Sequence, residues 1–136
     1  MVINEEIKLF PQEVPSFTRK ILKKLKINGV KEDILFDIKL ALNEALINSI
    51  KHGNSSDKKK SVFLKIAKKA NKLEISIEDQ GKGFDYKNLR LPTDKNNLTK
   101  QSGRGIFLIK NFMDELYFFD KGCKLKMVKY LNREDR

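Results

Sequence analysis

The helix that organises this chain ends in Asn43-Glu44-Ala45-Leu46-Ile47-Asn48-Ser49-Ile50-Lys51-His52-Gly53-Asn54. Apolar residues recur at helical spacing from about Glu32 to His52, and Gly53-Asn54 is a typical helix stop. At about 100° per residue, one broad apolar face suits packing on a sheet, and a second apolar stripe lies roughly opposite. Between the two lies an arc of polar residues: Asp37, Glu44, Asn48 and Lys51.

This polar arc has two interpretations. A carboxylate and an amide between apolar flanks are costly to bury unless something binds them, and an oxygen-seeking cation such as Mg²⁺ would do so. Glu44 would then act as a general base one turn from Asn48. The alternative is a solvated polar strip with contacts between residues four apart. The helix alone does not decide between them.

Two glycine pairs follow along the chain. Asp79-Gln80-Gly81-Lys82-Gly83-Phe84 comes directly after an alternating strand, so backbone can approach a ligand there while Asp79 accepts a hydrogen bond from a base amine. Ser102-Gly103-Arg104-Gly105 leads into a predicted helix, whose first N–H groups form a phosphate site with added charge from Arg104. Each pair taken alone is also compatible with a plain turn.

The remaining segments complete a predicted α+β fold. Strands are expected within 2–10, 62–66, 73–78, 116–119 and 123–131, helices within 14–25, 32–52 and 105–113, and a long polar loop over 85–102. This order predicts a two-layer α/β sandwich in which helices lie on one face of a mixed, mostly antiparallel sheet. We expect one domain over residues 1–136.

Composition limits the classes of protein. The 136 residues are 40% hydrophobic and carry 29 Lys+Arg against 18 Asp+Glu, a net charge of +11, which favours anionic partners. The longest apolar run has four residues, where a membrane span needs about 20. Cys123 is the only cysteine, which excludes an internal disulfide, and no signal peptide is visible. We expect a cytoplasmic protein without a membrane contact.

Together and in this order, the three motifs resemble the GHKL (Bergerat-type) ATPases. Residues 43–54 resemble the Asn-containing helix box of that superfamily, Asp79–Phe84 its first glycine box and Gly103–Gly105 its second. Within the superfamily, the short chain and the run from Gly105 to Glu115 resemble the bacterial anti-sigma factor serine/threonine-protein kinases.

The resemblance implies a role for each matching residue. Glu44 would be the catalytic base, Asn48 would bind Mg²⁺, and Asp79 would recognise the adenine amine of ATP. The glycines would let the nucleotide approach the backbone, residues 85–102 would form a nucleotide lid, and His52 would lie near the site or simply pack at the helix end. The remaining binding residues implied are Gly81, Gly83, Gly103, Arg104 and Gly105. Arg104 departs from the family pattern, which more often has an apolar residue there.

The function implied is that of an ATP-dependent kinase. It would phosphorylate a serine of an anti-anti-sigma protein, sequester a sigma factor, and form a homodimer, with no direct contact to nucleic acid. A nucleotide-binding switch module without transfer activity, or a stress-switch kinase that does not bind sigma, is the alternative. A basic nucleic-acid-binding domain with a chance glycine pattern is a third hypothesis.

Overall fold

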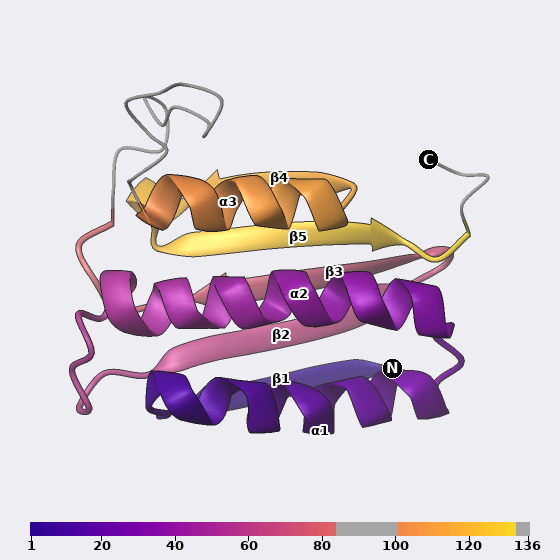
Figure 1. Cartoon of the computed structure of the whole chain (residues 1–136), viewed down its shortest axis with the longest axis horizontal. Coiled ribbons are helices and arrows are strands. Elements are labelled where there is room, and N and C mark those ends of the chain that lie inside the picture. Colours follow the sequence, from indigo (N-terminus) through magenta and orange to yellow (C-terminus); the bar gives the residue numbers. More distant parts are fainter. Residues whose placement is uncertain (84–100, 133–136) are drawn as a thin grey trace.

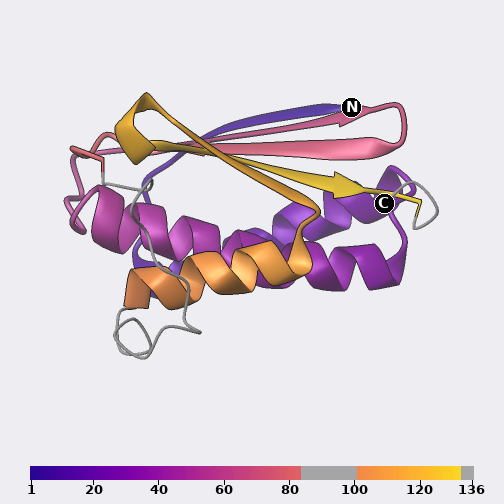
Figure 2. The same ribbon diagram turned by 90° about the horizontal axis from the view of Figure 1, so that it is seen from above.

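The computed structural model describes residues 1–83 and 101–132, and for residues 101–104 the backbone alone. Its strands are β1 (Val2–Ile7), β2 (Val62–Lys69), β3 (Lys72–Glu78), β4 (Glu115–Phe119) and β5 (Lys124–Tyr130), and its helices are α1 (Val14–Ile27), α2 (Glu32–Asn48) and α3 (Gln101–Phe112). The strands form one sheet in the order β1-β2-β3-β5-β4, and all three helices lie on one face of it (Figures 1 and 2). The predicted α+β, two-layer architecture is confirmed.

Every pairing among the described strands is antiparallel. The expected sheet was mostly antiparallel but mixed, so the described strands differ from the expectation in having no parallel pair. Tight connections explain two of the four pairings, β2 with β3 and β4 with β5. Lys69 pairs with Lys72, so Ala70 and Asn71 form a two-residue turn in which Ala70 has φ 50°. Asp120–Gly122 forms a 3₁₀ turn between β4 and β5, with positive φ at all three residues. Short turns of this kind join antiparallel neighbours.

The core lies between the sheet and the helix layer. In β3, the alternating residues Leu73, Ile75 and Ile77 are fully buried, as the period-2 pattern predicts. The apolar face of α2 meets them, because α2 lies between α1 and α3 across the middle of the sheet (Figure 1). The largest side chains of α1 and α2 that are fully buried in this layer are Ile21, Leu25, Ile34, Ile38, Leu42 and Leu46.

Two helix boundaries differ from expectation. The α-helical part of α2 ends at Asn48 and continues as a π-helical turn over Ser49–Gly53, a feature that often accompanies functional sites. The third helix begins at Gln101 rather than at Gly105. Gly105 therefore lies inside the helix, where its missing side chain serves a close contact with α2 rather than a helix start.

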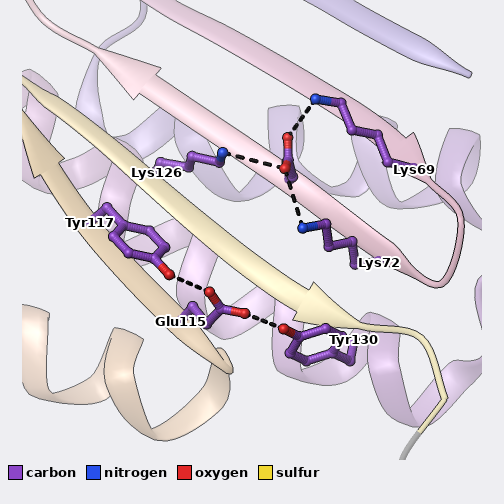
Figure 3. Close-up of polar contacts among 7 residues, drawn as sticks. Lys69, Lys72, Glu115, Tyr117, Lys126 and Tyr130 are labelled. Carbon is purple, nitrogen blue, oxygen red and sulfur yellow. Dashed lines mark hydrogen bonds and ion pairs between the residues drawn. The ribbon is translucent and has the colours of Figure 1, made fainter. Parts of the chain in front are cut away.

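The opposite face of the sheet is covered by no helix within the described residues (Figure 2). Near its middle, the Glu74 carboxylate pairs with Lys69 at 2.9 Å, Lys126 at 3.3 Å and Lys72 at 3.7 Å (Figure 3). The hydrogen bond from Lys69, supported by Lys126, holds the pKa of Glu74 below its ordinary value. Across the same face, Tyr117 and Tyr130 donate hydrogen bonds to Glu115 (Figure 3).

A buried lysine ties three elements together. Lys129 of β5 is 2% exposed, and its ammonium donates to Asp37 Oδ2 of α2 at 2.9 Å and to the Phe112 carbonyl at the end of α3 at 2.6 Å. Removing one partner of a buried pair leaves the other charge uncompensated, which is more costly than never having formed the pair.

Among the described helices, none is long and apolar enough to cross a membrane.

We expect Lys129→Ala to lower the free energy of unfolding by about 3 kcal/mol, because Asp37 and the Phe112 carbonyl both lose their partner. Lys126→Ala on the outward side of the same strand removes only a partly exposed pair and should cost less than about 1 kcal/mol. Urea denaturation of both variants measures the difference. Equal losses would show that the buried pair contributes no more than a surface contact.

Candidate active site

The polar arc of α2 faces α3. Ala41, Leu42, Ala45 and Leu46 are buried and fix the rotation of α2, which leaves Glu44 and Asn48 half-buried beside the third helix. A Cβ built on Gly105 would lie 2.6 Å from Asn48 Nδ2, 3.2 Å from Asn48 Oδ1 and 3.1 Å from Glu44 Oε2. Only glycine allows α3 to approach these two side chains so closely. The two functional side chains of α2 and the second glycine motif therefore meet.

Asp79 stands at the end of β3, in a turn tied to the β4–β5 connection. Its backbone N–H donates to the Cys123 carbonyl at 2.9 Å, and its Oδ1 accepts the Gly81 N–H at 2.9 Å. The Cys123 thiol donates to the Gly81 carbonyl at 3.1 Å. The two bonds to Cys123 hold the first glycine motif against the turn that precedes β5, and the bond between Gly81 and Asp79 closes the motif on itself.

The end of α2 touches this motif directly. A side chain on Gly53 would overlap the Asp79 carboxylate, and one on Gly81 would overlap the Gly53 carbonyl oxygen. Gly83 has φ 83°, in the left-handed region, and a side chain there would overlap the Lys121 carbonyl oxygen. The backbones of three segments are thus in contact at positions where only glycine fits.

The surroundings of Asp79 shift the pKa of its carboxyl group. Burial raises the pKa of Asp79 above its ordinary value, and the hydrogen bond from the Gly81 N–H opposes that rise. Burial also raises the pKa of the Cys123 thiol, and the neighbouring Asp79 carboxylate adds to the effect. A carboxylate that is partly desolvated in a hollow, with hydrogen-bonding capacity to spare, is a candidate for binding a polar ligand group.

A cavity of about 210 Å³ joins these features. Four predicted site residues border it: Asn48, His52, Asp79 and Gly83. Its other walls are largely apolar and include Ile77, Ile106, Ile109 and Leu125. A largely apolar cavity that is bordered by a carboxylate and an amide fits a flat heterocycle that carries an amine.

The structure places the remaining predicted residues as follows. Glu44 lies beside Gly105, and Gly81 lies against Gly53 next to Asp79. His52 is exposed at the rim rather than packed at the helix end. Gly103 and Arg104 lie in the first turn of α3, but the Arg104 side chain and residues 85–100 of the predicted 85–102 lid lie outside the described residues. The roles of these residues stay predictions.

Sequence reasoning missed two contributors. The sequence indicates Gly53 as a helix stop and as part of the helix box, but not that the Asp79 carboxylate fills the space its side chain would need. Cys123 was assigned only to a closing strand, although it borders the cavity and donates to Gly81. Their local patterns carry no sign of these contacts, because both contacts join segments more than 20 residues apart.

The donor set fits Mg²⁺ better than a metal held by protein alone. Within residues 1–83 and 101–132, no three His, Cys, Asp or Glu side chains gather as a metal-binding group. The Asn48 and Glu44 side-chain oxygens meet beside Gly105, and one or two protein oxygens are what Mg²⁺ takes when phosphates and water complete its shell.

Comparison with known proteins agrees with this geometry. The model of the histidine kinase-like ATPase domain family matches residues 9–129. The serine-protein kinase RsbW of Staphylococcus aureus (strain MSSA476) is 31% identical over 116 residues, covering 78% of this chain and 72% of the relative. RsbW of Bacillus licheniformis is 31% identical over 113 residues, covering 78% and 71%. RsbW of Listeria monocytogenes is 28% identical over 113 residues, covering 78% and 72%.

These matches confirm the resemblance to the GHKL ATPases and to their small serine/threonine-kinase branch. The match spans both the helix that carries Glu44 and Asn48 and the glycine motifs that meet it. The chain belongs to the family of histidine kinase-like ATPase domains.

Proposed function

We propose that this chain is an ATP-dependent serine/threonine-protein kinase whose active site is the cavity between α2, α3 and the end of β3. The observation that carries the proposal is the meeting of three distant segments. Asn48 and Asp79 border one cavity, and Gly105 closes over Glu44 and Asn48. The relatives named as serine-protein kinases support the type of activity.

Adenine would occupy the apolar part of the cavity. Its ring would lie among Ile77, Ile109 and Leu125, and the Asp79 carboxylate would accept a hydrogen bond from the exocyclic amine. Because Gly81 N–H already occupies one Asp79 oxygen, the carboxylate is held in one orientation before the base arrives. Preorganisation of this kind reduces the entropy lost on binding.

The phosphates would lie toward α3. The first N–H groups of that helix, from Gln101 onward, have no partner within the helix and suit phosphate oxygens. Asn48 would hold Mg²⁺ through Oδ1, and the ion, when bound, neutralises charge on the phosphates. Arg104 lies in the same turn and would add positive charge.

Glu44 would serve as the base in phosphoryl transfer. It would accept the proton of a serine hydroxyl as the serine oxygen forms a bond to the γ-phosphorus of ATP. The bond from that phosphorus to the bridging oxygen breaks, and ADP leaves with the bridging oxygen. We propose that the serine belongs to an anti-anti-sigma protein and that the kinase sequesters a sigma factor.

Two alternatives remain distinct in experiment. A nucleotide-binding switch module would bind ATP without labelling any protein, and a stress-switch kinase would label a serine protein without retaining sigma. Labelled ATP with a candidate serine protein separates the first from a kinase, and capture of a sigma factor in the presence of Mg-ATP separates the second.

We expect Glu44→Ala to reduce phosphate transfer by about a thousandfold, the range of general base catalysis, while ATP still binds. Glu78→Ala, which alters a half-buried glutamate on the outward face of β3, is the matched control and should retain transfer. Single-turnover transfer from labelled ATP and calorimetric titration measure the two properties. Unchanged transfer by Glu44→Ala would remove Glu44 from this role.

Asp79→Asn should make the chain more stable at neutral pH and at the same time weaken its binding of ATP. Because burial raises the pKa of Asp79, the folded chain holds this proton at a pH where the unfolded chain has released it, and the stabilisation it brings is lost as pH rises through the folded pKa. The asparagine removes that loss, so we expect a higher melting temperature near about pH 7 and little change near about pH 4.

In the same variant, ATP affinity should fall roughly tenfold, since a hydrogen bond to a charged group is lost. Differential scanning fluorimetry across pH and calorimetry with Mg-ATP measure both effects. A variant that melts lower at neutral pH and binds ATP normally would contradict both expectations.

We also propose that the kinase forms a homodimer through the uncovered face of the sheet. That face carries five lysines and four glutamates on a chain of net charge +11, so two copies can meet there with little repulsion. Exposed apolar side chains, Val2, Phe63, Tyr117 and Phe119, surround the charged centre. A two-fold interface requires one surface that suits itself.

Phe63→Lys should weaken this dimer, because it removes an apolar contact and adds charge to the face. Within the chain the new lysine would lie between Glu6 and Glu78, its neighbours on the adjacent strands, so the fold should tolerate it. Phe36→Lys, at an exposed position on α2, is the control. Sedimentation velocity should show monomers for Phe63→Lys alone, and a dimeric Phe63→Lys variant would place the interface elsewhere.

A further inference from the structure

A closed ring of hydrogen bonds lies behind the Asp79 corner. Asn54 Nδ2 donates to the Ser61 carbonyl at 2.9 Å, the Ser61 N–H donates to Gln80 Oε1 at 2.7 Å, and the Gln80 N–H donates to Asn54 Oδ1 at 2.7 Å. The three residues come from the end of the π-helical turn, the start of β2 and the turn after β3. The ring therefore joins three segments that are distant in sequence.

Because two of the three residues in this ring are buried, their polar atoms need these hydrogen bonds, and the orientation of the Asn54 side chain is fixed by them. Asn54 and Ser61 are each 2% exposed, and a buried amide is costly unless its polar atoms are paired. The Asn54 backbone is fixed as well, because its N–H donates to the Ser49 carbonyl at 2.8 Å and its carbonyl accepts the Asp57 N–H at 2.9 Å. With both ends of its amide engaged, Asn54 can present Oδ1 to Gln80 in only one orientation.

The ring lies one residue away from the contact that forms the site. Asn54 follows Gly53, and Gln80 follows Asp79. Gly53 is the residue whose missing side chain makes room for the Asp79 carboxylate, and its carbonyl oxygen occupies the space beside Gly81. Gly53 and Asp79 border the cavity, whereas Asn54 is not among the described residues that line it. Asn54 would therefore act on a bound nucleotide through its neighbours, Gly53 along the chain and Asp79 by way of the Gln80 N–H, rather than by direct contact.

We propose that Asn54 is a positioning residue for base recognition: by holding the Gln80 N–H, it keeps the Asp79 carboxylate where it meets the exocyclic amine of adenine. This inference rests on the proposed nucleotide site and adds to it the determinant of base selectivity. A hydrogen bond to the amine depends on placement within a few tenths of an ångström, whereas apolar contacts with the ring tolerate small shifts. Loss of the ring should therefore affect the amine contact more than the rest of the nucleotide.

The test compares Mg-ADP with Mg-IDP, because the inosine base lacks the exocyclic amine. In the wild-type chain we expect ADP to bind roughly tenfold more tightly than IDP, the value of one charge-assisted hydrogen bond. Asn54→Ala should weaken ADP binding and leave IDP binding nearly unchanged, so that the ratio falls toward one. A residue that merely supports the fold would change both affinities by the same factor.

Three further variants sharpen the comparison. Asn54→Leu removes the acceptor for the Gln80 N–H while nearly keeping the volume of the buried side chain, so it should reduce the ratio as Asn54→Ala does. Gln80→Ala removes only the acceptor for the Ser61 N–H and leaves the Gln80 N–H bonded to Asn54 Oδ1, so it should retain most of the ratio. Asn71→Ala is the matched control, since Asn71 lies in the β2–β3 turn at the far end of both strands and its Nδ2 has no hydrogen-bond partner. It should retain the wild-type ratio.

The outcomes separate the two claims. If the wild-type chain discriminates ADP from IDP but Asn54→Ala and Asn54→Leu keep that ratio, the positioning role is overturned and the proposed function stands. If Asn54→Ala does not fold, Asn54→Leu carries the same test. If the wild-type chain binds neither nucleotide, the proposed function falls and this inference falls with it.

Discussion

The burial of one face of α2 against the sheet determines where the polar residues of that helix point. Ile38, Leu42 and Leu46 are fully enclosed, so rotation of α2 would expose a large apolar area to water. Glu44 and Asn48 are therefore held toward α3, and the absence of a side chain at Gly105 lets that helix close over them. Packing in the core thus orients the groups to which we assign catalysis and metal binding.

The Asp79 carboxylate is partly buried in the folded chain, and this burial disfavours its charged form. Burial raises the pKa of Asp79, which means that the folded chain holds the ionised carboxylate at some cost. Glycine contacts and backbone hydrogen bonds keep the carboxylate in place despite this cost. A carboxylate that is held at an electrostatic cost where three segments meet is typical of a binding site rather than of a structural turn.

Charge is distributed unevenly over the two faces of the molecule. The uncovered face of the sheet is nearly neutral, with Glu74 at the centre of three lysines, so the excess positive charge is carried by the rest of the chain. Two surfaces of different character result. The neutral face suits a second copy of the same chain, and the basic remainder attracts acidic partners at longer range.

The order of the elements, the α+β class and the chemical types at the site can be predicted from the sequence, because alternating and helical spacing are local patterns. The sequence placed Glu44, Asn48 and Asp79 on the right elements through the same patterns. The folded structure alone reveals that Gly105 is a helix-packing residue, that α3 begins at Gln101, that Cys123 bonds to Asp79 and that Asn54 bonds to Gln80. These features depend on contacts between segments far apart in the chain, and no local periodicity records which distant backbone will lie against a given residue.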